Sequence, residues 1–226
     1  MNYLLTNITN FLESNISPNK NITDIKMKKH QEHIVCIKAS AVKHREHGFV
    51  DYDLNLSDLM LGQRAMLEND DDFRQVLPIS IFTHKEKVWA YERTSKGGES
   101  RLHNKIAVAV GGHWDMDDIL TKDGVIDLEA SLQKAMDREL EEEVKLTSSI
   151  TQSTRLKKML CADDTEVDRV HMGLIYVHEL GGEGIESAED QLKTVGFVSP
   201  KELLEGDYNI EVWARIICQI LVEQNS

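Results

Sequence analysis

A chain of 226 residues, with 41% hydrophobic and 29% charged residues, is long enough to bury one substantial core and has the composition of a globular protein. Its formal net charge of −13 argues against non-specific binding to large nucleic acids or anionic membranes, but allows a small anionic substrate held through metal ions. The three cysteines have no metal-binding spacing, and their odd number does not form a complete set of disulfides. No apolar run approaches the roughly 18 residues of a membrane span. We therefore expect a cytoplasmic protein.

The first 30 residues are expected to form an N-terminal element of their own. Apolar residues between Tyr3 and Leu12 recur at the spacing of one helical face, which predicts a docking helix or a partly ordered arm. Residues 14–30 are rich in Ser, Asn, Lys and Thr and contain Pro18, which is typical of a connector. We therefore divide the chain into a helix and connector over residues 1–30 and one domain, with an N-terminal extension, over residues 31–226.

Strand and helix patterns follow one another up to residue 110. The β-branched content of His33–Ala41 predicts a strand, and the apolar periodicity of Leu54–Glu68 predicts a helix. Leu77–Phe82 and Lys87–Arg93 are separated by a short polar turn, which predicts a hairpin. Ile106–Val110 is expected to be a short apolar strand.

The segment after that strand carries the most informative pattern in the chain. The strand ends at Gly111 and Gly112, a pair that suits a close approach of the backbone to another group. Trp114–Asp123 is acidic and is expected to be a solvated insertion. Asp127 is a suitable cap for a helix that we expect to run from Glu129 to about Val144.

The remaining third of the chain completes an α/β pattern. Lys157–Cys161, Arg169–Leu180 and Thr194–Val198 are predicted as strands. Pro200–Leu204 is predicted as a helical turn and Asn209–Glu223 as an amphipathic helix. Strands on both sides of one central helix, with a second helix last, predict a mixed β-sheet between helices.

Three carboxylates share one face of the central helix. Glu139, Glu142 and Glu143 stand at positions i, i+3 and i+4. Their charges repel one another, and they lie near the helix end where the macrodipole disfavours anions. The arrangement becomes favourable if Mg²⁺ or Mn²⁺ binds this face, because these ions take carboxylate ligands. A solvated charged face is the simpler alternative.

This stretch resembles the signature of the Nudix hydrolase family, Gly-x5-Glu-x7-Arg-Glu-U-x-Glu-Glu-x-Gly-U, in which U is apolar. The positions that match in register are Arg138, Glu139, Leu140, Glu142, Glu143 and Leu146, and Gly112 corresponds to the opening glycine. The strands and helices around it follow a Nudix-like order from about residue 74 to residue 222. The resemblance therefore implies a Nudix-type α/β/α sandwich around a mixed sheet.

The chain departs from the family pattern at two positions. Lys145 stands in place of the final glycine, so the chain must leave the helix differently. The early glutamate of the pattern falls on Ala130, with Glu129 one position away. The three metal-binding glutamates of the pattern are nevertheless intact.

A narrower resemblance is to a group of bacterial and phage Nudix proteins described as predicted phosphoesterases. The matching segments are Phe73–Pro78, Tyr91–Arg93, Gly98–Leu102, Gly111–His113 and Val170–Leu174. This resemblance covers about two thirds of the chain and names no substrate.

The family resemblance implies hydrolysis of a diphosphate linkage with Mg²⁺ or Mn²⁺ as cofactor. It assigns metal binding to Glu139, Glu142 and Glu143, with the backbone carbonyl of Gly112 as a further ligand. It also gives catalytic roles to Glu139, Glu142 and Arg138: Glu139 as a group that orients or deprotonates water, and Arg138 as a partner that holds a glutamate in place.

In many family members the general base lies on a later loop. Glu183, Glu186 and Glu189 are the candidates here, and the sequence does not choose among them.

Four further residues are candidates for binding a small-molecule diphosphate substrate. Arg93, Arg101 and Lys105 flank the strand before the acidic helix, and His113 directly follows the glycine pair.

The main alternative to an enzyme is a non-catalytic Nudix-like module that binds a nucleotide or metabolite. The two departures from the signature, Lys145 and Ala130, keep this alternative open. A homodimer is a further family-level expectation.

Overall fold

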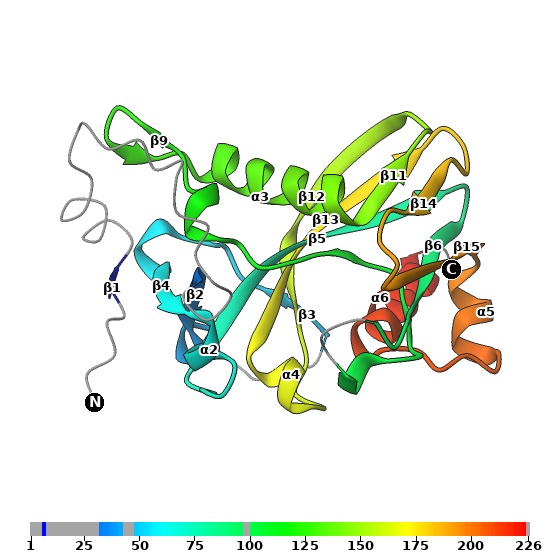
Figure 1. Ribbon diagram of the computed structural model, residues 1–226, viewed down its shortest axis with the longest axis horizontal. Helices are drawn as coiled ribbons and strands as arrows, with labels where there is room; N and C mark the ends of the chain where they lie inside the picture. The colour runs from blue at the N-terminus through cyan, green and yellow to red at the C-terminus, as the bar shows by residue number, and fades with distance from the viewer. Residues whose placement is uncertain (1–5, 8–31, 43–47, 97–99, 225–226) are drawn as a thin grey trace.

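A mixed β-sheet forms the centre of the computed structural model, which describes residues 6–7, 32–42, 48–96 and 100–224 (Figure 1). Its strands are β1 Thr6–Asn7, β2 His33–Lys38, β3 Gly48–Asp51, β4 Met60–Gln63, β5 Phe73–His84, β6 Lys87–Arg93, β7 Ile106–Ala107, β8 Val110–Gly111, β12 Ile150–Cys161, β13 His171–Leu180 and β15 Leu192–Val198. Two small antiparallel pairs lie outside it: β9 Thr121–Lys122 with β10 Val125–Ile126, and β11 Val144–Leu146 with β14 Ile185–Ser187. The helices are α2 Arg64–Leu67, α3 Leu128–Glu143, α4 Glu166–Arg169, α5 Pro200–Glu205 and α6 Val212–Gln224.

The long strands β5, β12 and β13 form the middle of the sheet. β5 and β13 are parallel, with paired residues from His171 opposite Gln75 to Glu179 opposite Thr83. β12 pairs with the other edge of β13 in the antiparallel direction, and β2, β6 and β8 pair with successive parts of β5, also antiparallel. The expected mixed sheet is therefore confirmed.

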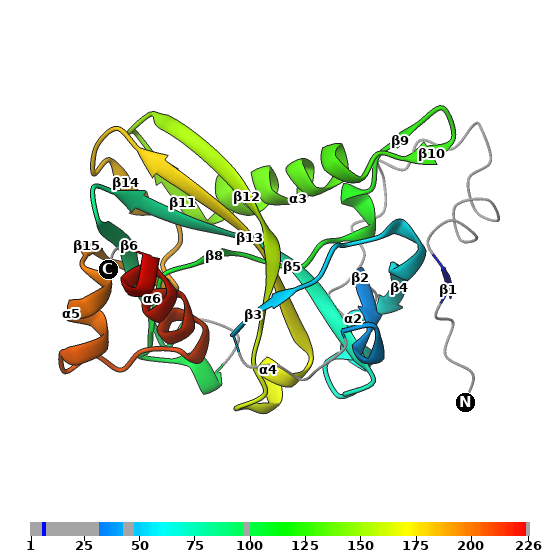
Figure 2. The ribbon, with the colours of Figure 1, turned by 180° about the vertical axis from the view of Figure 1, so that it is seen from behind.

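Helices cover both faces of this sheet. Along β13, Met172 and Leu174 face the cluster that contains buried residues of α3, whereas Ile175 faces the cluster that contains buried residues of α6. This alternation follows from the two-residue period of a strand. Figures 1 and 2 show α3 along one side of the long strands and α6 on the other. The predicted α/β/α sandwich is confirmed.

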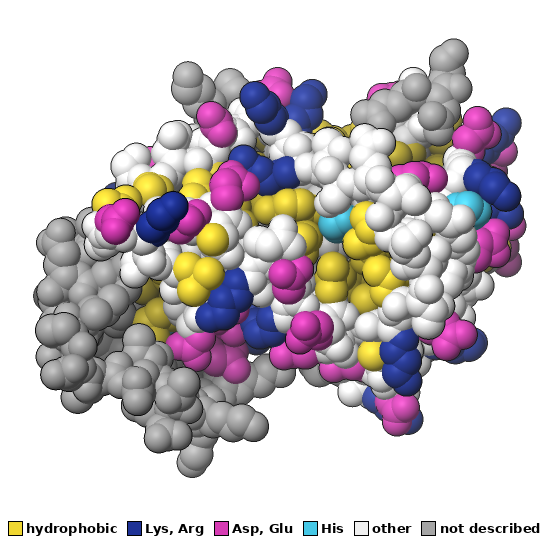
Figure 3. All heavy atoms as spheres, turned by 90° about the horizontal axis from the view of Figure 1, so that it is seen from above, with side chains coloured by type: hydrophobic (Ala, Val, Ile, Leu, Met, Phe, Trp, Pro, Cys, Tyr) yellow, Lys and Arg dark blue, Asp and Glu magenta, His cyan; other side chains and the backbone are white. Residues whose placement is uncertain are grey.

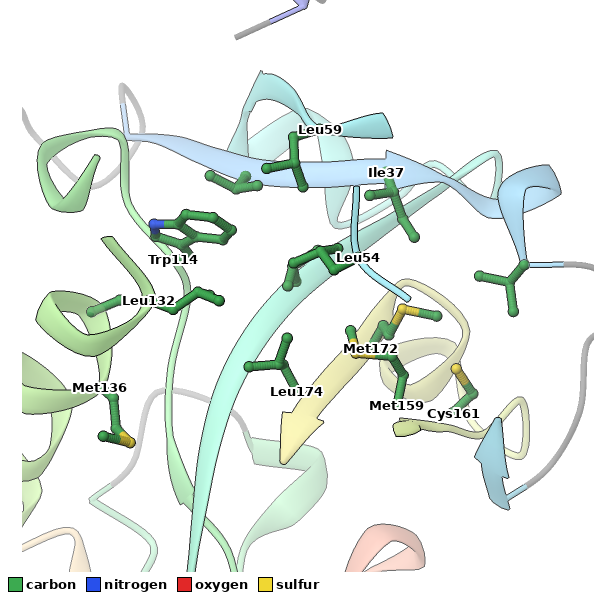
Figure 4. Packing of buried hydrophobic residues seen from close by; sticks show 14 of the residues in the cluster. Ile37, Leu54, Leu59, Trp114, Leu132, Met136, Met159, Cys161, Met172 and Leu174 are labelled. Carbon is green, nitrogen blue, oxygen red and sulfur yellow. The ribbon is translucent and has the colours of Figure 1, made fainter. Parts of the chain in front are cut away.

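Helix α3 follows the sequence prediction closely. It begins at Leu128, and the side chain of Asp127 accepts a hydrogen bond of 3.1 Å from the backbone N–H of Ala130, as expected of a helix cap. Its apolar side, with Leu132 fully buried, packs on the sheet (Figure 4). At its C-terminal end the chain passes directly into β11, where Lys145 pairs with Glu186. No turn glycine is needed because the chain becomes extended at Val144.

The helix predicted over Leu54–Glu68 is wrong in most of its length. This segment forms a 3-10 turn at Leu56–Asp58, then β4, and only a short helix α2. β4 lies between β1 and β2 in the sheet, so pairing with strands distant in sequence decides its conformation.

Smaller differences affect three other predicted elements. The strand predicted over Ile106–Val110 is divided into β7, which pairs with β6, and β8, which pairs with β5. β12 begins at Ile150, well before the predicted Lys157. Its first residues were not predicted as a strand because they are exposed and carry no apolar alternation. Within the predicted N-terminal helix, Thr6–Asn7 form β1; the rest of that helix and the connector up to residue 31 lie outside the described residues.

Acidic and basic side chains are interspersed on the face shown in Figure 3, with apolar side chains between them. Within the described ranges, no helix is long and apolar enough to cross a membrane.

Candidate active site

The structure brings nine of the residues predicted for the site to one pocket of about 590 Å³. These residues are Arg138, Glu139, Glu142, Glu143, Gly112, His113, Arg93, Arg101 and Lys105. They come from the second half of α3, the glycine pair at the end of β8, the end of β6 and the segment before β7. Acidic and basic groups far apart in sequence therefore line a common cavity.

The three glutamates differ in their exposure within this pocket. The side chain of Glu139 is 12% exposed, whereas that of Glu142 is 59% exposed. Burial raises the pKa of the Glu139 carboxyl, and the adjacent Arg138 charge opposes this increase. Burial also raises the pKa of Glu143 to about 8; Arg93 lowers it, and Glu139 and Glu189 raise it further. Glu139, Glu142 and Glu143 thus form an acidic wall of the pocket. The negative charge of these crowded carboxyl groups is only partly compensated.

The two glycines of the pair are required for different close contacts. Gly111 has a φ of +154°, and a Cβ atom there would lie 2.1 Å from the backbone oxygen of Pro78 on β5. A Cβ atom on Gly112 would lie 2.5 Å from the carboxylate atoms of Glu139. The backbone at this pair therefore lies close to Pro78 on β5 and to the carboxylate of Glu139.

Arg138 lies at the centre of the acidic wall. Its Nη1 donates to Glu139, and its Nη2 donates to the backbone oxygen of His113 at 2.9 Å and to Oδ2 of Asp118 at 2.8 Å. Glu142 is more distant, with its Oε2 at 3.9 Å from Nη1. The expected pairing of Arg138 with a glutamate is present.

The segment Trp114–Asp123 is only in part the solvated insertion that its acidity predicts: Asp117 and residues 120–123 are exposed, whereas two of its residues are buried. Trp114 is fully buried in the core cluster beside α3, as Figure 4 shows, and Asp118 is 1% exposed. A charged side chain is buried here because the guanidinium of Arg138 pairs with it. The sequence did carry a signal, since Asp115 and Asp118 have the three-residue spacing of a cap, and the Asp115 N–H donates to Asp118 at 3.2 Å.

The donor set fits a hard divalent cation in composition. Three carboxylates line one pocket, and the missing Cβ of Gly112 leaves a cradle that the Glu139 carboxylate fills. In the described parts of the chain, however, no three His, Cys, Asp or Glu side chains converge as a preformed metal-binding group. The Glu139 carboxylate is instead paired with Arg138, and the side chain of Glu142 is 59% exposed.

The predicted cationic residues are not equivalent. Nε of Arg93 lies 2.5 Å from Oε1 of Glu211, and its guanidinium carbon lies 5.6 Å from the centroid of the Tyr91 ring. Arg101 forms an exposed ion pair of 3.3 Å with Glu166. The charge of Arg93 is therefore shared with a buried carboxylate. This partner could not be identified from the sequence because it lies 118 residues away.

Two histidines, His113 and His171, also line the pocket, and the buried amide of Gln75 lies behind one of them. Nδ1 of His171 donates to the backbone oxygen of Val167 at 2.7 Å, which leaves its Nε2 as an acceptor in the neutral ring. Nε2 of His113 lies 2.8 Å from Oε1 of Gln75 and 3.4 Å from Nε2 of His171. The proton of His113 is therefore placed on Nε2, where both acceptors face it.

The loop after β14 contributes one of the three candidates for a general base. Glu189 lines the pocket, and the pKa of its carboxyl is raised by burial and by the charge of Glu142. Glu186 lies on β14 opposite Lys145, and neither it nor Glu183 lines the pocket. Among these three, the geometry favours Glu189.

Known proteins resemble the chain in sequence and in fold, although no family model matches it. Protein YmaB of Bacillus subtilis (strain 168) is 32% identical over 162 residues, which make up 70% of this chain and 76% of that protein. Tm1382, described as "a putative Nudix hydrolase", has a TM-score of 0.64 at 22% identity, over 85% of this chain and 100% of its own. A MutT/nudix family protein from Enterococcus faecalis has a TM-score of 0.45 at 14% identity, over 66% of this chain and 62% of its own. The likeness to Tm1382 shows a Nudix-type fold.

Proposed function

The chain belongs to the family of Bacillus subtilis Protein YmaB and has a Nudix-type fold, and we propose that it is a Nudix-type pyrophosphohydrolase dependent on Mg²⁺ or Mn²⁺. Its substrate would be a nucleoside diphosphate derivative or a related phosphorylated metabolite, cleaved at a diphosphate linkage. The observation that carries this proposal is the position of Glu139, Glu142 and Glu143 in one pocket with Arg101 and Lys105.

The divalent cation would be held by Glu139, Glu142 and Glu143, with the backbone carbonyl of Gly112 as a further ligand. When bound, such a cation polarises phosphoryl oxygens and lowers the pKa of a coordinated water. Arg138 keeps the Glu139 carboxylate against Gly112 through its charge-assisted hydrogen bond.

The remaining pocket residues would bind the substrate and accept a proton. Arg101 and Lys105 line the same pocket as the acidic wall and would bind phosphate oxygens, while Arg93 divides its charge between Glu211 and the pocket. His113 would contact the substrate beside the glycine pair. Glu189 is our candidate for the general base, because it lines the pocket whereas Glu183 and Glu186 do not.

Hydrolysis of a substrate panel tests the proposal. Purified full-length chain is incubated with nucleoside, sugar and dinucleotide diphosphates in the presence of Mg²⁺ or Mn²⁺, and released phosphate or pyrophosphate is measured. We expect at least one substrate to be cleaved, and we expect Glu142→Gln and Glu143→Gln each to lower kcat by about 10- to 100-fold or more. Glu141→Gln is the matched control, because Glu141 is exposed on the same helix and does not line the pocket. Equal activity in all three variants would refute the assignment of the acidic wall.

A non-catalytic binding module is the second candidate function. The observation in its favour is that no three candidate metal ligands converge in the described part of the chain. The same panel separates the two functions: a compound that raises the melting temperature without being hydrolysed favours the module. Light scattering of the same samples would test the expected homodimer.

A further inference from the structure

We propose that Arg64 is a specificity-determining residue of the candidate active site. Its guanidinium donates a hydrogen bond to an uncharged acceptor, such as a carbonyl or hydroxyl oxygen, in the group that the substrate carries beside its diphosphate. This inference rests on the proposed function, because the acidic wall is taken to hold the diphosphate through a divalent cation. It gives the N-terminal extension, which precedes the Nudix-like order of elements beginning near residue 74, a part in substrate recognition.

The pocket of about 590 Å³ extends from the N-terminal extension to the C-terminal helix. Arg64, the first residue of α2, lines it together with Glu139 and Glu143 of the acidic wall. Val212 and Trp213, at the start of α6, line it as well. Figure 1 shows α2 and α6 well apart, on the left and right of the view. Arg64 therefore marks the end of the pocket that lies away from α6.

Strand pairing within the extension brings Arg64 against Glu32. β2 and β4 are antiparallel, with His33 opposite Gln63, and the backbone N–H of Arg64 donates to the backbone oxygen of Glu32 at 3.0 Å. The side chains meet too, since Nη1 of Arg64 donates to Oε2 of Glu32 at 3.1 Å. Helix α2 adds a partner four residues on, because Nε donates to Oε1 of Glu68 at 3.1 Å. Two carboxylates therefore hold one guanidinium.

These two ion pairs fix the direction of the donors that remain on Arg64. Nε and Nη1 each have a carboxylate partner, whereas Nη2 has no hydrogen-bond partner among the described residues. Because the guanidinium is planar, holding Nε and Nη1 also fixes Nη2. The side chain is 25% exposed and lines the pocket. Arg64 thus offers the substrate a donor that is already oriented, so little conformational freedom is lost on binding.

The charges at this end of the pocket favour an uncharged acceptor over a further phosphate. Glu32 and Glu68 line the pocket beside Arg64, so an anion bound here would face two carboxylates. Burial lowers the pKa of His171, the backbone oxygen of Val167 and the charge of Glu68 raise it, and the charge of Arg64 lowers it. The Arg64–Glu68 pair therefore lies close to the histidines of the pocket. A neutral acceptor there gains a charge-assisted hydrogen bond without the repulsion.

The test compares the affinities of the full-length protein for three non-hydrolysable probes in the presence of Mn²⁺. Two are methylene-bridged analogues of ADP-ribose and UDP-glucose, and the third is methylenediphosphonate, the same diphosphate core without an attached group. We expect Arg64→Gln to weaken binding of at least one nucleotide analogue by about 10- to 100-fold, the usual effect of losing a hydrogen bond from a charged donor. Its affinity for methylenediphosphonate should equal that of the unchanged protein.

Arg155→Gln is the matched control for this substitution. Arg155 is 31% exposed and lies 2.9 Å from Glu129 in an ion pair, but it does not line the pocket. Its affinities for all three probes should be those of the unchanged protein. The inference is overturned if Arg64→Gln weakens the three probes equally, if it weakens neither nucleotide analogue, or if Arg155→Gln causes the same selective loss.

A second variant covers the case in which Arg64→Gln does not fold. Arg64→Lys keeps the charge but replaces the planar fork by a single nitrogen, and we expect the same selective loss. Unchanged binding of both nucleotide analogues by this variant would overturn the inference.

Hydrolysis of ADP-ribose, UDP-glucose and the rest of the panel by the unchanged protein separates this inference from the proposed function. Selective loss of binding in Arg64→Gln, without hydrolysis of any panel member by the unchanged protein, would reject the enzyme and support the role of Arg64. Hydrolysis with no effect of Arg64 would support the enzyme and overturn the inference. An unchanged protein that binds neither nucleotide analogue would also overturn it.

Discussion

The carboxylate of Glu139 occupies the space where any residue other than glycine at position 112 would place its Cβ atom, 2.5 Å from the carboxylate atoms. The backbone at Gly112 and the side chain of Glu139 therefore constrain each other. A hydrogen bond from Arg138 also holds the Glu139 carboxylate in this position. The glycine that corresponds to the opening of the signature is thus explained by its contact with Glu139, the first of the three glutamates that match in register.

Replacement of Gly112 by Ala should displace the Glu139 carboxylate and weaken Mn²⁺ binding by about 10-fold or more. The effect on folding should be small, because the new methyl group meets the end of a side chain and not the backbone. Mn²⁺ titration and thermal unfolding measure the two effects separately. Gly182→Ala is a suitable control, because its Cβ would meet only the Ser148 hydroxyl at 3.2 Å. Unchanged affinity in Gly112→Ala would contradict this account.

The buried pair between Arg93 and Glu211 should contribute more to stability than a surface pair. Glu211→Gln removes the charged partner of Arg93, whose side chain is only 30% exposed. We therefore expect the free energy of unfolding to fall by about 2 kcal/mol. Denaturation in urea measures this change.

Glu92→Gln is the matched control for that pair. Glu92 lies beside Arg93 on β6 and forms an ion pair of 3.3 Å with Lys193, whose side chain is 70% exposed. A surface pair of this kind is worth at most about 1 kcal/mol. Equal destabilisation by the two variants would show that the Arg93–Glu211 pair has no special weight.

The sequence predicted the local features of the site and missed those made by distant segments. The acidic face of α3 and its cap at Asp127 depend on residues within a few positions of one another, so periodicity and spacing revealed them. The pairing of Asp118 with Arg138 and of Arg93 with Glu211 joins residues 20 and 118 positions apart, and only the folded chain brings them together. β4 was missed for the same reason, because its partners β1 and β2 decide its conformation.

Acidification should destabilise the protein through His178. Burial lowers the pKa of His178 below its ordinary value of 6.5, and its ring nitrogens lie near the hydroxyls of Ser153 (2.9 Å) and Ser80 (3.2 Å). As the pH falls below 6.5, the unfolded state takes up this proton first, so the free energy of unfolding should decrease until the pH passes the folded-state pKa.

Comparison with His178→Gln isolates this contribution. Both proteins are unfolded in urea at a series of pH values, and the difference between their free energies of unfolding is plotted against pH. The unchanged protein should lose stability more steeply than the variant below pH 6.5. Parallel curves would mean that His178 does not titrate differently in the folded and unfolded states.

Gly173 connects the packing of the central sheet to the shape of the pocket. A Cβ atom at this position on β13 would lie 2.9 Å from Cδ1 of Ile79 and 3.0 Å from Cζ3 of Trp213, a residue that lines the pocket. Gly173→Ala should cost about 1–3 kcal/mol in stability, the usual cost of overpacking a core. The indole of Trp213 must shift to make room, so we also expect KM for the best substrate of the panel to change. The change in kcat should be smaller, because the acidic wall lies on α3 and is not displaced. Steady-state kinetics well below the melting temperature would check this, and a loss confined to kcat would show that Trp213 does not shape the substrate site.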